Sequence, residues 1–344
     1  MARWRQTSRR HLVETKKRRI LVLDGGGIKG AFAAAFLEGI EESSGKRIAE
    51  HFDLIAGTST GGIIALGLGL GMSAREIAQF YVNDGPRIFD QRNALDASNS
   101  LTRFMEWCRG SRNSARRLSS SKYDSTALRA SLERAFQSKR LGDSTVRLLI
   151  PAYSADNQDV YVFKTRHHPR FQMDWKESAV NVALATAAAP TYFQAHPMPS
   201  GAPLIDGGIW ANNPAGLAAV EARSVLEWKD DDLFIVRLGC TEESLDIPLE
   251  SGLAGLLRKS TALFMQGQSR GADGTAMLLS NHRQESPRYF TFQPKVPVGK
   301  YSLDGVEMIG RLRGLGAVNA RDALPLFEKH FLYEKTDLFR PFPL

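Results

Sequence analysis

A chain of 344 residues, 43% of them hydrophobic, is long enough for one large domain or two modest ones and can bury a sizeable core, which excludes a disordered chain. Its net charge of +8 lies almost wholly in the first 19 residues, where eight basic side chains stand against one acidic one. Two cysteines, Cys108 and Cys240, provide neither a disulfide framework nor metal-site spacing, and no run of 18 apolar residues could span a bilayer.

Strand-type and helix-type patterns alternate along the chain, which predicts an α/β sandwich built on a mainly parallel sheet. Ser73 and Glu76 have the spacing of a capping box and predict the start of a helix there. The expected elements are, in chain order, a strand over 19–24, a helix over 30–42, a strand over 51–57, helices over 62–71, 73–81 and 125–136, strands over 146–152 and 160–164, helices over 177–188 and 214–227, strands over 233–239 and 289–292, and a helix over 317–330.

Residues 1–18 are interpreted as a basic tail, and residues 19–344 as one domain with a C-terminal helical extension. The tail is either a solvated terminus, which is slightly favoured, or a segment attracted to anionic lipid or nucleic acid. No apolar segment follows the basic start, so a secretory signal is not predicted and a cytoplasmic protein is expected. Residues 109–122 are rich in serine and arginine and predict a mobile loop.

The segment GGGIKG, residues 25–30, joins the first strand to the first helix. Its backbone N–H groups lie at a helix N-terminus, which favours an anion, either a phosphate or a transient oxyanion. Its spaced glycines also match a dinucleotide-binding fingerprint, but Ala56 and Gly57 end the second strand, where that fingerprint expects an acidic residue. A P-loop is disfavoured because Lys29 is followed by Gly30, where that motif needs serine or threonine after the lysine.

The second strand ends in GTSTGG, which is a G-x-S-x-G motif between a strand and a helix. In that context the serine lies on a sharp, strained turn with its hydroxyl exposed to substrate. The flanking Gly57 and Gly61 are expected because a side chain at either position would collide across the turn. Ser59 is therefore a candidate nucleophile.

A serine nucleophile needs a base within hydrogen-bonding reach. Asp206 follows a short strand pattern and precedes two glycines, so its carboxylate is expected at the end of the sheet where open α/β folds bind ligands. No histidine has a sequence context typical of a catalytic loop, and each is interpreted as structural or solvated: His11, His51, His167, His168, His196, His282 and His330.

The motifs GGGIKG, GTSTGG, ATAAAPTYF and DGGIWANNP, in this order, resemble the patatin-like phospholipase family over residues 19–227. The resemblance implies a three-layer α/β/α sandwich and a phospholipase A-type hydrolase of fatty-acyl esters that needs no cofactor. It also implies that Ser59 attacks the ester, that Asp206 is its only side-chain partner, and that an acyl-enzyme forms and is hydrolysed. The matched positions are Gly25, Gly26, Gly27 and Gly30 in the oxyanion hole, Gly57 and Gly61 around the nucleophile, and Gly207 and Gly208 after the aspartate.

Two longer stretches, residues 40–89 and 301–327, are similar to patatin phospholipases of bacterial anti-phage (CBASS) systems. That resemblance implies activation by a cyclic dinucleotide such as cyclic GMP–AMP (cGAMP). It also implies a cytoplasmic enzyme that touches the inner membrane peripherally and degrades its phospholipids. A nucleic acid polymer is not expected as a partner, and a homo-oligomer stays open. The sequence does not place the nucleotide site.

Other functions remain open at this point. A constitutive patatin-like lipase would need no activator. An α/β-hydrolase esterase could form a Ser-His-Asp triad, because Ser59 and Asp206 are followed by His282 and His330 in the order that this fold requires. Its nucleophile, however, would come unusually early, after only two strands. A nucleotide-binding module and a non-enzymatic membrane binder are the remaining alternatives.

Overall fold

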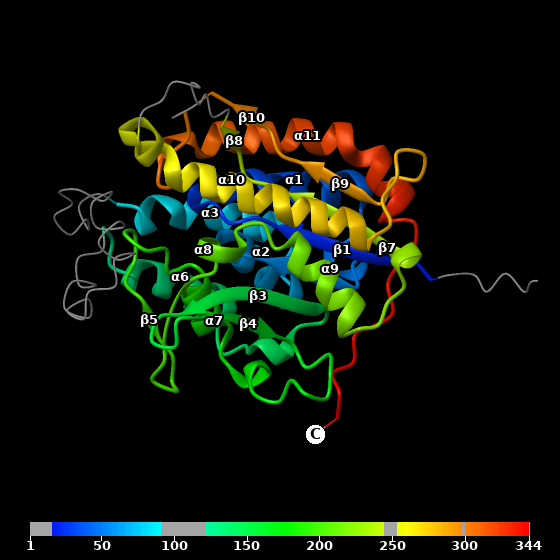
Figure 1. The fold of residues 1–344 in the computed structure, drawn as a ribbon, viewed down its shortest axis with the longest axis horizontal. Coiled ribbons are helices and arrows are strands. Elements are labelled where there is room, and N and C mark those ends of the chain that lie inside the picture. Colours follow the sequence, from blue (N-terminus) through cyan, green and yellow to red (C-terminus); the bar gives the residue numbers. More distant parts are fainter. Residues whose placement is uncertain (1–15, 91–121, 244–252, 298–299, 344) are drawn as a thin grey trace, which may run out of the picture.

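The computed structural model describes residues 16–90, 122–243, 253–297 and 300–343. Helices cover both faces of a central sheet, which is the three-layer α/β/α arrangement (Figure 1). The basic residues 1–15 and most of the predicted loop over residues 109–122 lie outside the described residues. Within the described part of the chain, no helix is both long and apolar enough to cross a membrane.

The central sheet has eight strands in the order β5-β6-β3-β2-β1-β7-β9, with β4 paired to β3. The pairs β3–β2, β2–β1, β1–β7 and β7–β9 are parallel, whereas β4 and β6 run antiparallel to β3. The strands are β1 (Arg18–Leu23), β2 (Leu54–Gly57), β3 (Arg147–Ser154), β4 (Asp159–Lys164), β5 (His196–Pro197), β6 (Pro203–Asp206), β7 (Leu233–Leu238) and β9 (Tyr289–Phe292). A separate parallel pair joins β8 (Glu242–Glu243) to β10 (Lys295–Val296).

Strand β1 explains why both faces of the sheet carry helices. All its apolar residues are buried, and successive side chains point to opposite faces. Leu21 and Leu23 join the larger core cluster, while Ile20 and Val22 join a second cluster formed with α9. The larger-cluster layer holds α1 (Gly30–Ser44), α2 (Thr60–Gly69), α3 (Ala74–Ile88), α6 (Thr126–Phe136), α7 (Ala179–Thr186) and α11 (Ile309–His330), and the other side holds α8 (Gly208–Ala211), α9 (Ala215–Ser224) and α10 (Leu253–Leu279).

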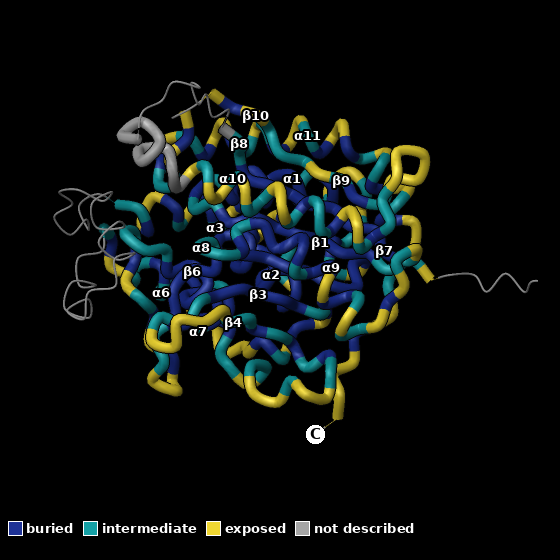
Figure 2. Tube along the Cα trace, in the orientation of Figure 1, coloured by how far each residue is buried: buried dark blue, intermediate teal, exposed yellow. Residues whose placement is uncertain are grey.

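Burial is deepest along the sheet and the helices that touch it (Figure 2). Helix α2 is buried at every position, in keeping with its apolar and glycine-rich sequence. The predicted capping box of α3 is confirmed: Ser73 Oγ accepts from the Glu76 backbone at 3.1 Å, and Glu76 Oε2 accepts from the Ser73 backbone at 2.7 Å. Short 3-10 turns lie at Gly27–Lys29, Ile48–Glu50, Leu141–Asp143, Asp174–Lys176, Asp230–Asp232 and Val306–Met308.

Candidate active site

Ser59 lies on the sharp turn between β2 and α2. Its backbone has φ 54° and ψ −123°, a positive φ that serine rarely adopts outside a strained turn. The flanking glycines are required by space: a Cβ on Gly57 would lie 2.2 Å from the carbonyl oxygen of Gly61, and a Cβ on Gly61 would lie 2.3 Å from that of Leu23. The turn therefore has the tight geometry that the motif predicts.

Two threonines fix the position of this turn. The backbone N–H of Ser59 donates to Thr186 Oγ1 at 3.0 Å, and Thr186 in turn donates to the carbonyl of Pro151 at 2.6 Å. Thr58 Oγ1 donates to the carbonyl of Ala211 at 2.6 Å. The serine turn is thus tied both to the end of α7 and to the segment that follows Asp206.

Asp206 ends β6, where it pairs in register with Ala152 of β3. Its carboxyl group accepts a hydrogen bond at 2.6 Å from the backbone N–H of Gly208, and it lies close enough to the Ser59 side chain for that side chain to act on its pKa. Burial raises the pKa of this carboxyl from 3.8 to about 6, although Ser59 and the Gly208 N–H both act in the opposite direction. The structure therefore brings the two predicted side chains close together, and the pKa of the carboxyl group is raised toward neutral pH.

The glycine loop passes directly beside Ser59. A Cβ on Gly25 would lie 3.2 Å from Ser59 Cβ and 2.4 Å from Asn212 Oδ1, so a side chain there would displace the serine or the asparagine. The N–H of Gly25 donates to the Asn212 carbonyl at 3.0 Å, and that of Gly30 bonds within its own turn. The N–H groups of Gly26 and Gly27 donate no hydrogen bond to any residue that the structure describes.

Neither histidine of the Ser-His-Asp alternative reaches the serine. His330 stacks on Phe234, which pairs with Arg19 at the start of β1. His282 Nδ1 accepts the backbone N–H of Tyr289 at 3.0 Å, at the start of β9. Ser59 lies beyond the other end of these parallel strands. At roughly 3.3 Å per residue, that end of β1 is about 13 Å from Arg19. The structure therefore excludes both histidines as partners of Ser59.

The family model for "Patatin-like phospholipase" matches residues 21–219, which contain the serine turn, the aspartate and the glycine loop. The chain belongs to the patatin-like phospholipase family. This family consists of lipid ester hydrolases, so the predicted family and class of enzyme are confirmed, together with the α/β/α fold.

Three bacterial relatives are named "cGAMP-activated phospholipase". The Pseudomonas aeruginosa protein is 37% identical over 214 residues, which are 62% of this chain and 59% of that protein. The Escherichia coli protein is 31% identical over 283 residues, covering 78% of this chain and 74% of the relative. The Vibrio cholerae protein is 34% identical, covering 69% and 68%. This chain thus spans less than two thirds of the Pseudomonas relative's length.

A buried network of ion pairs holds the glycine loop in place. Arg237 of β7 contacts the carboxylate of Asp24, at the start of the loop, with its Nε 3.0 Å from Oδ1. The same guanidinium contacts Asp273 of α10 at 3.1 Å, and Tyr289 donates to Asp273 at 2.5 Å. Burial raises the pKa of the Asp24 carboxyl, although Arg237 acts to lower it. The loop is therefore anchored to β7, β9 and α10 at once.

Sequence reasoning assigned no role to three of these residues. Asn212 lies within the DGGIWANNP motif, where its carbonyl and amide contact Gly25, with the amide Nδ2 3.4 Å from the Gly25 oxygen. Thr186 lies within ATAAAPTYF. Both motifs were available as signals, although no spacing rule points to either side chain. Arg237 had no signal beyond a charged residue inside an apolar strand, a pattern that indicates a buried partner.

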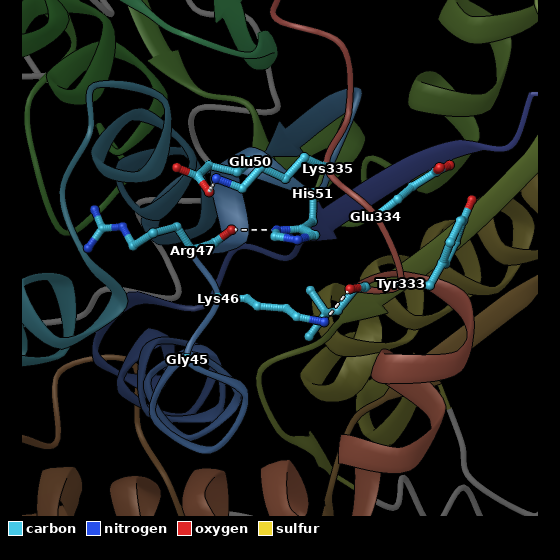
Figure 3. A pocket seen from close by; sticks show the side chains of 9 residues that line it. Gly45, Lys46, Arg47, Glu50, His51, Tyr333, Glu334 and Lys335 are labelled. Atoms are coloured by element: carbon cyan, nitrogen blue, oxygen red, sulfur yellow. Dashed lines mark hydrogen bonds and ion pairs between the residues drawn. The ribbon is translucent and has the colours of Figure 1, made fainter.

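A cavity of about 300 Å³ lies between the end of α1 and the segment that follows α11 (Figure 3). Lys46 donates there to the carbonyl of Leu332 at 2.7 Å, and Lys335 pairs with Glu50 at 2.7 Å. Both lysines are therefore already paired with oxygen atoms of the protein. None of the residues around Ser59 lines this cavity. Among the described residues, no cluster of three His, Cys, Asp or Glu side chains could hold a metal ion.

Proposed function

We propose that this chain is a phospholipase A-type serine hydrolase that cleaves fatty-acyl esters of membrane phospholipids, with Ser59 as the nucleophile and Asp206 as its base. The single observation that carries the proposal is the position of the Ser59 side chain, on its strained turn, beside the buried Asp206 carboxyl group. A hydroxyl on a strained turn beside one carboxylate, with neither His282 nor His330 within reach, fits a two-residue mechanism.

Asp206 takes the proton of Ser59 as the serine oxygen attacks the ester carbonyl. A carboxyl group with a pKa of about 6 is ionised at neutral pH and is a stronger base than an exposed aspartate. The same carboxyl group then protonates the leaving alcohol and later activates the water that hydrolyses the acyl-enzyme. Each step uses one proton, which Asp206 alone accepts and returns.

The oxyanion of the tetrahedral intermediate is assigned to the N–H groups of Gly26 and Gly27. The N–H groups of Gly25 and Gly30 already donate to backbone carbonyls, so the proposed oxyanion hole narrows from four glycines to these two. One donor of this kind contributes about 3–4 kcal/mol to transition-state stabilisation. Such a contribution compensates for a base that is weaker than a histidine.

The test is hydrolysis of phospholipid vesicles by the purified full chain, measured as released fatty acid. We expect Ser59→Ala to lower the rate by about a thousandfold or more and to abolish labelling by a fluorophosphonate probe. Ser73→Ala is the matched control, because it removes a serine hydroxyl that only caps α3. Hydrolysis by Ser59→Ala at the wild-type rate would remove the nucleophile assignment.

We further propose that a cyclic dinucleotide such as cGAMP raises this activity, in anti-phage defence on the cytoplasmic face of the inner membrane. Support comes from the three relatives with that activator in their names, at 31–37% identity. Assays with and without a panel of cyclic dinucleotides test the proposal. Stimulation by one member is expected, whereas high basal activity that no member changes would indicate a constitutive lipase.

A further inference from the structure

A second cavity, of about 200 Å³, lies on the same side of the sheet as the serine turn. It lies between the start of α6, the end of α7 and the segment that leads into β5, and we call it the α6–α7 cavity. Its apolar lining consists of Leu128, Leu184, Ala187, Ala188, Phe193 and Pro197. The first five are less than 9% exposed, so most of the apolar wall belongs to the protein core.

The wall of the α6–α7 cavity is continuous with the backbone that holds the reacting pair. Ala188, which lines the cavity, accepts the backbone N–H of Asp206 at 3.0 Å. Thr186, next to the lining residue Ala187, accepts the backbone N–H of Ser59 at 3.0 Å. The cavity therefore begins within two residues of a group that positions the nucleophile and of a group that positions the base.

Arg129 is the one lining residue that is charged at pH 7. Its side chain is 40% exposed, its guanidinium lies 3.9 Å from Glu133 of the same helix, and its charge also acts on His196. Nε2 of His196 lies 3.3 Å from Asn181 Oδ1, and burial lowers the pKa of this imidazole to about 4, so it is neutral at pH 7. An apolar ligand fits such a lining better than an anion does.

We propose that the α6–α7 cavity holds the fatty-acyl chain of the ester while Ser59 attacks its carbonyl, an inference that rests on the proposed hydrolase function. A methylene group needs roughly the 30 Å³ that a water molecule occupies in the liquid, so the cavity accommodates about six or seven methylenes. The subsite thus sets a preferred acyl length, and carbons beyond it lie outside the cavity.

The test measures kcat/KM of the full chain on a series of p-nitrophenyl esters from acetate to palmitate. Each methylene buried in the cavity raises kcat/KM by up to about fourfold, and the increase stops once the cavity is full. Leu128→Trp narrows the cavity and moves the optimum to shorter chains, by about two methylene volumes. Phe193→Ala widens the cavity and moves the optimum to longer chains. Thermal melts check that both variants fold.

Val220→Trp is the control, because it adds the same ring on an exposed position of α9, outside the cavity. Opposite shifts in Leu128→Trp and Phe193→Ala, with an unchanged profile in the control, are the expected result. An active enzyme whose chain-length profile is the same in all four proteins would overturn the acyl subsite alone. A wild-type chain that hydrolyses none of the esters would overturn the proposed function, and the subsite with it.

Discussion

The side chain of Ser59 lies beside the carboxyl group of Asp206, close enough to act on its pKa, in a site where the two residues are only 8% and 5% exposed. The contact joins the end of β2 to the end of β6, two strands that are separated in the sheet by β3. Because water is largely excluded, the electrostatic interaction between the two groups is stronger than it would be at the surface. The proposed nucleophile and base are therefore already close together before any substrate binds.

The first prediction concerns the pH dependence of catalysis. Asp206 acts as a base only when ionised, and burial raises the pKa of its carboxyl to about 6. We expect kcat/KM for a soluble ester to rise with pH, to reach half its maximum near pH 6 and to level above pH 7. A pH–rate profile of the wild-type chain measures this, with a neutral ester so that the substrate itself does not titrate.

A histidine base would give a similar profile, so the control variants are His282→Gln and His330→Gln. Both are expected to leave the half-maximum near pH 6, because neither ring reaches Ser59. Asp206→Asn is expected to lose activity at every pH by about a thousandfold or more. Loss of activity in a folded histidine variant would instead support a Ser-His-Asp triad.

The raised pKa of Asp206 also predicts that its ionised carboxylate lowers the stability of the folded protein. The folded-state pKa lies above the ordinary value of 3.8, so the folded state favours protonated Asp206. This contribution is fully present below pH 3.8 and is lost as the pH rises through about 6. The difference corresponds to about 3 kcal/mol at pH 8. We therefore expect Asp206→Asn to be more stable than the wild type at pH 8, in urea denaturation, and the gain to shrink toward pH 4.

Other acids with perturbed pKa values contribute to the overall curve, so only the difference between the two proteins is informative. Asp206→Asn should unfold at higher urea than the wild type at pH 8, with an unchanged slope. A variant that is less stable than the wild type at pH 8 would show that the carboxylate is stabilised in the folded site, against the raised pKa.

The alternating first half of the fold could be predicted from sequence because local patterns decide it. Strand β1 and helix α1 follow directly from a buried apolar run and from a helical pattern after the glycine loop. Helix α11 begins at Ile309, eight residues before its predicted start, because glycines disfavour a helix on propensity alone. Here Gly316 is needed for close packing: a Cβ there would lie 2.5 Å from the carbonyl of Phe32 on α1.

Helix α10 was not predicted for a related reason. Its sequence contains Gly267, Gly271 and Gly274, and each costs helix stability. Tertiary contacts outweigh that cost, because Asp273 joins the buried network of Arg237 and Ala276 is fully buried against α9. Such contacts join residues far apart in the chain, so no local pattern reports them. The candidate nucleophile and base were named from motifs, but their contact could be established only in three dimensions.

The glycine loop gives a prediction about steric collision. The φ of Gly26, 171°, lies outside the left-handed region that favours glycine, yet a Cβ there would lie 2.4 Å from Cys240 Sγ and 2.8 Å from Cys240 Cβ. We expect Gly26→Ala to displace the loop N–H groups and to lower kcat/KM at least tenfold, since overpacking of this kind costs about 1–3 kcal/mol. Removal of the obstructing side chain in Gly26→Ala with Cys240→Gly should restore much of the activity.

A double-mutant cycle over the two substitutions measures the coupling. Gly267→Ala is the control, because a Cβ at that position meets no atom within 4 Å, and it should leave kcat/KM unchanged. Simple additivity of the Gly26→Ala and Cys240→Gly effects would show that the two side chains do not compete for space.

The last prediction concerns Arg237, whose guanidinium lies between two buried carboxylates. Arg237→Met leaves Asp24 and Asp273 without their cation in a site from which water is excluded, and a change of this kind costs about 3–5 kcal/mol. Because Asp24 begins the glycine loop, activity should fall together with stability. Arg75→Met is the matched control: Arg75 pairs with Glu42 at the exposed end of α1, where water screens the charges, so little change is expected. Urea denaturation of both variants measures the change in the free energy of unfolding. Equal stability of Arg237→Met and the wild type would show that the network does not hold the loop.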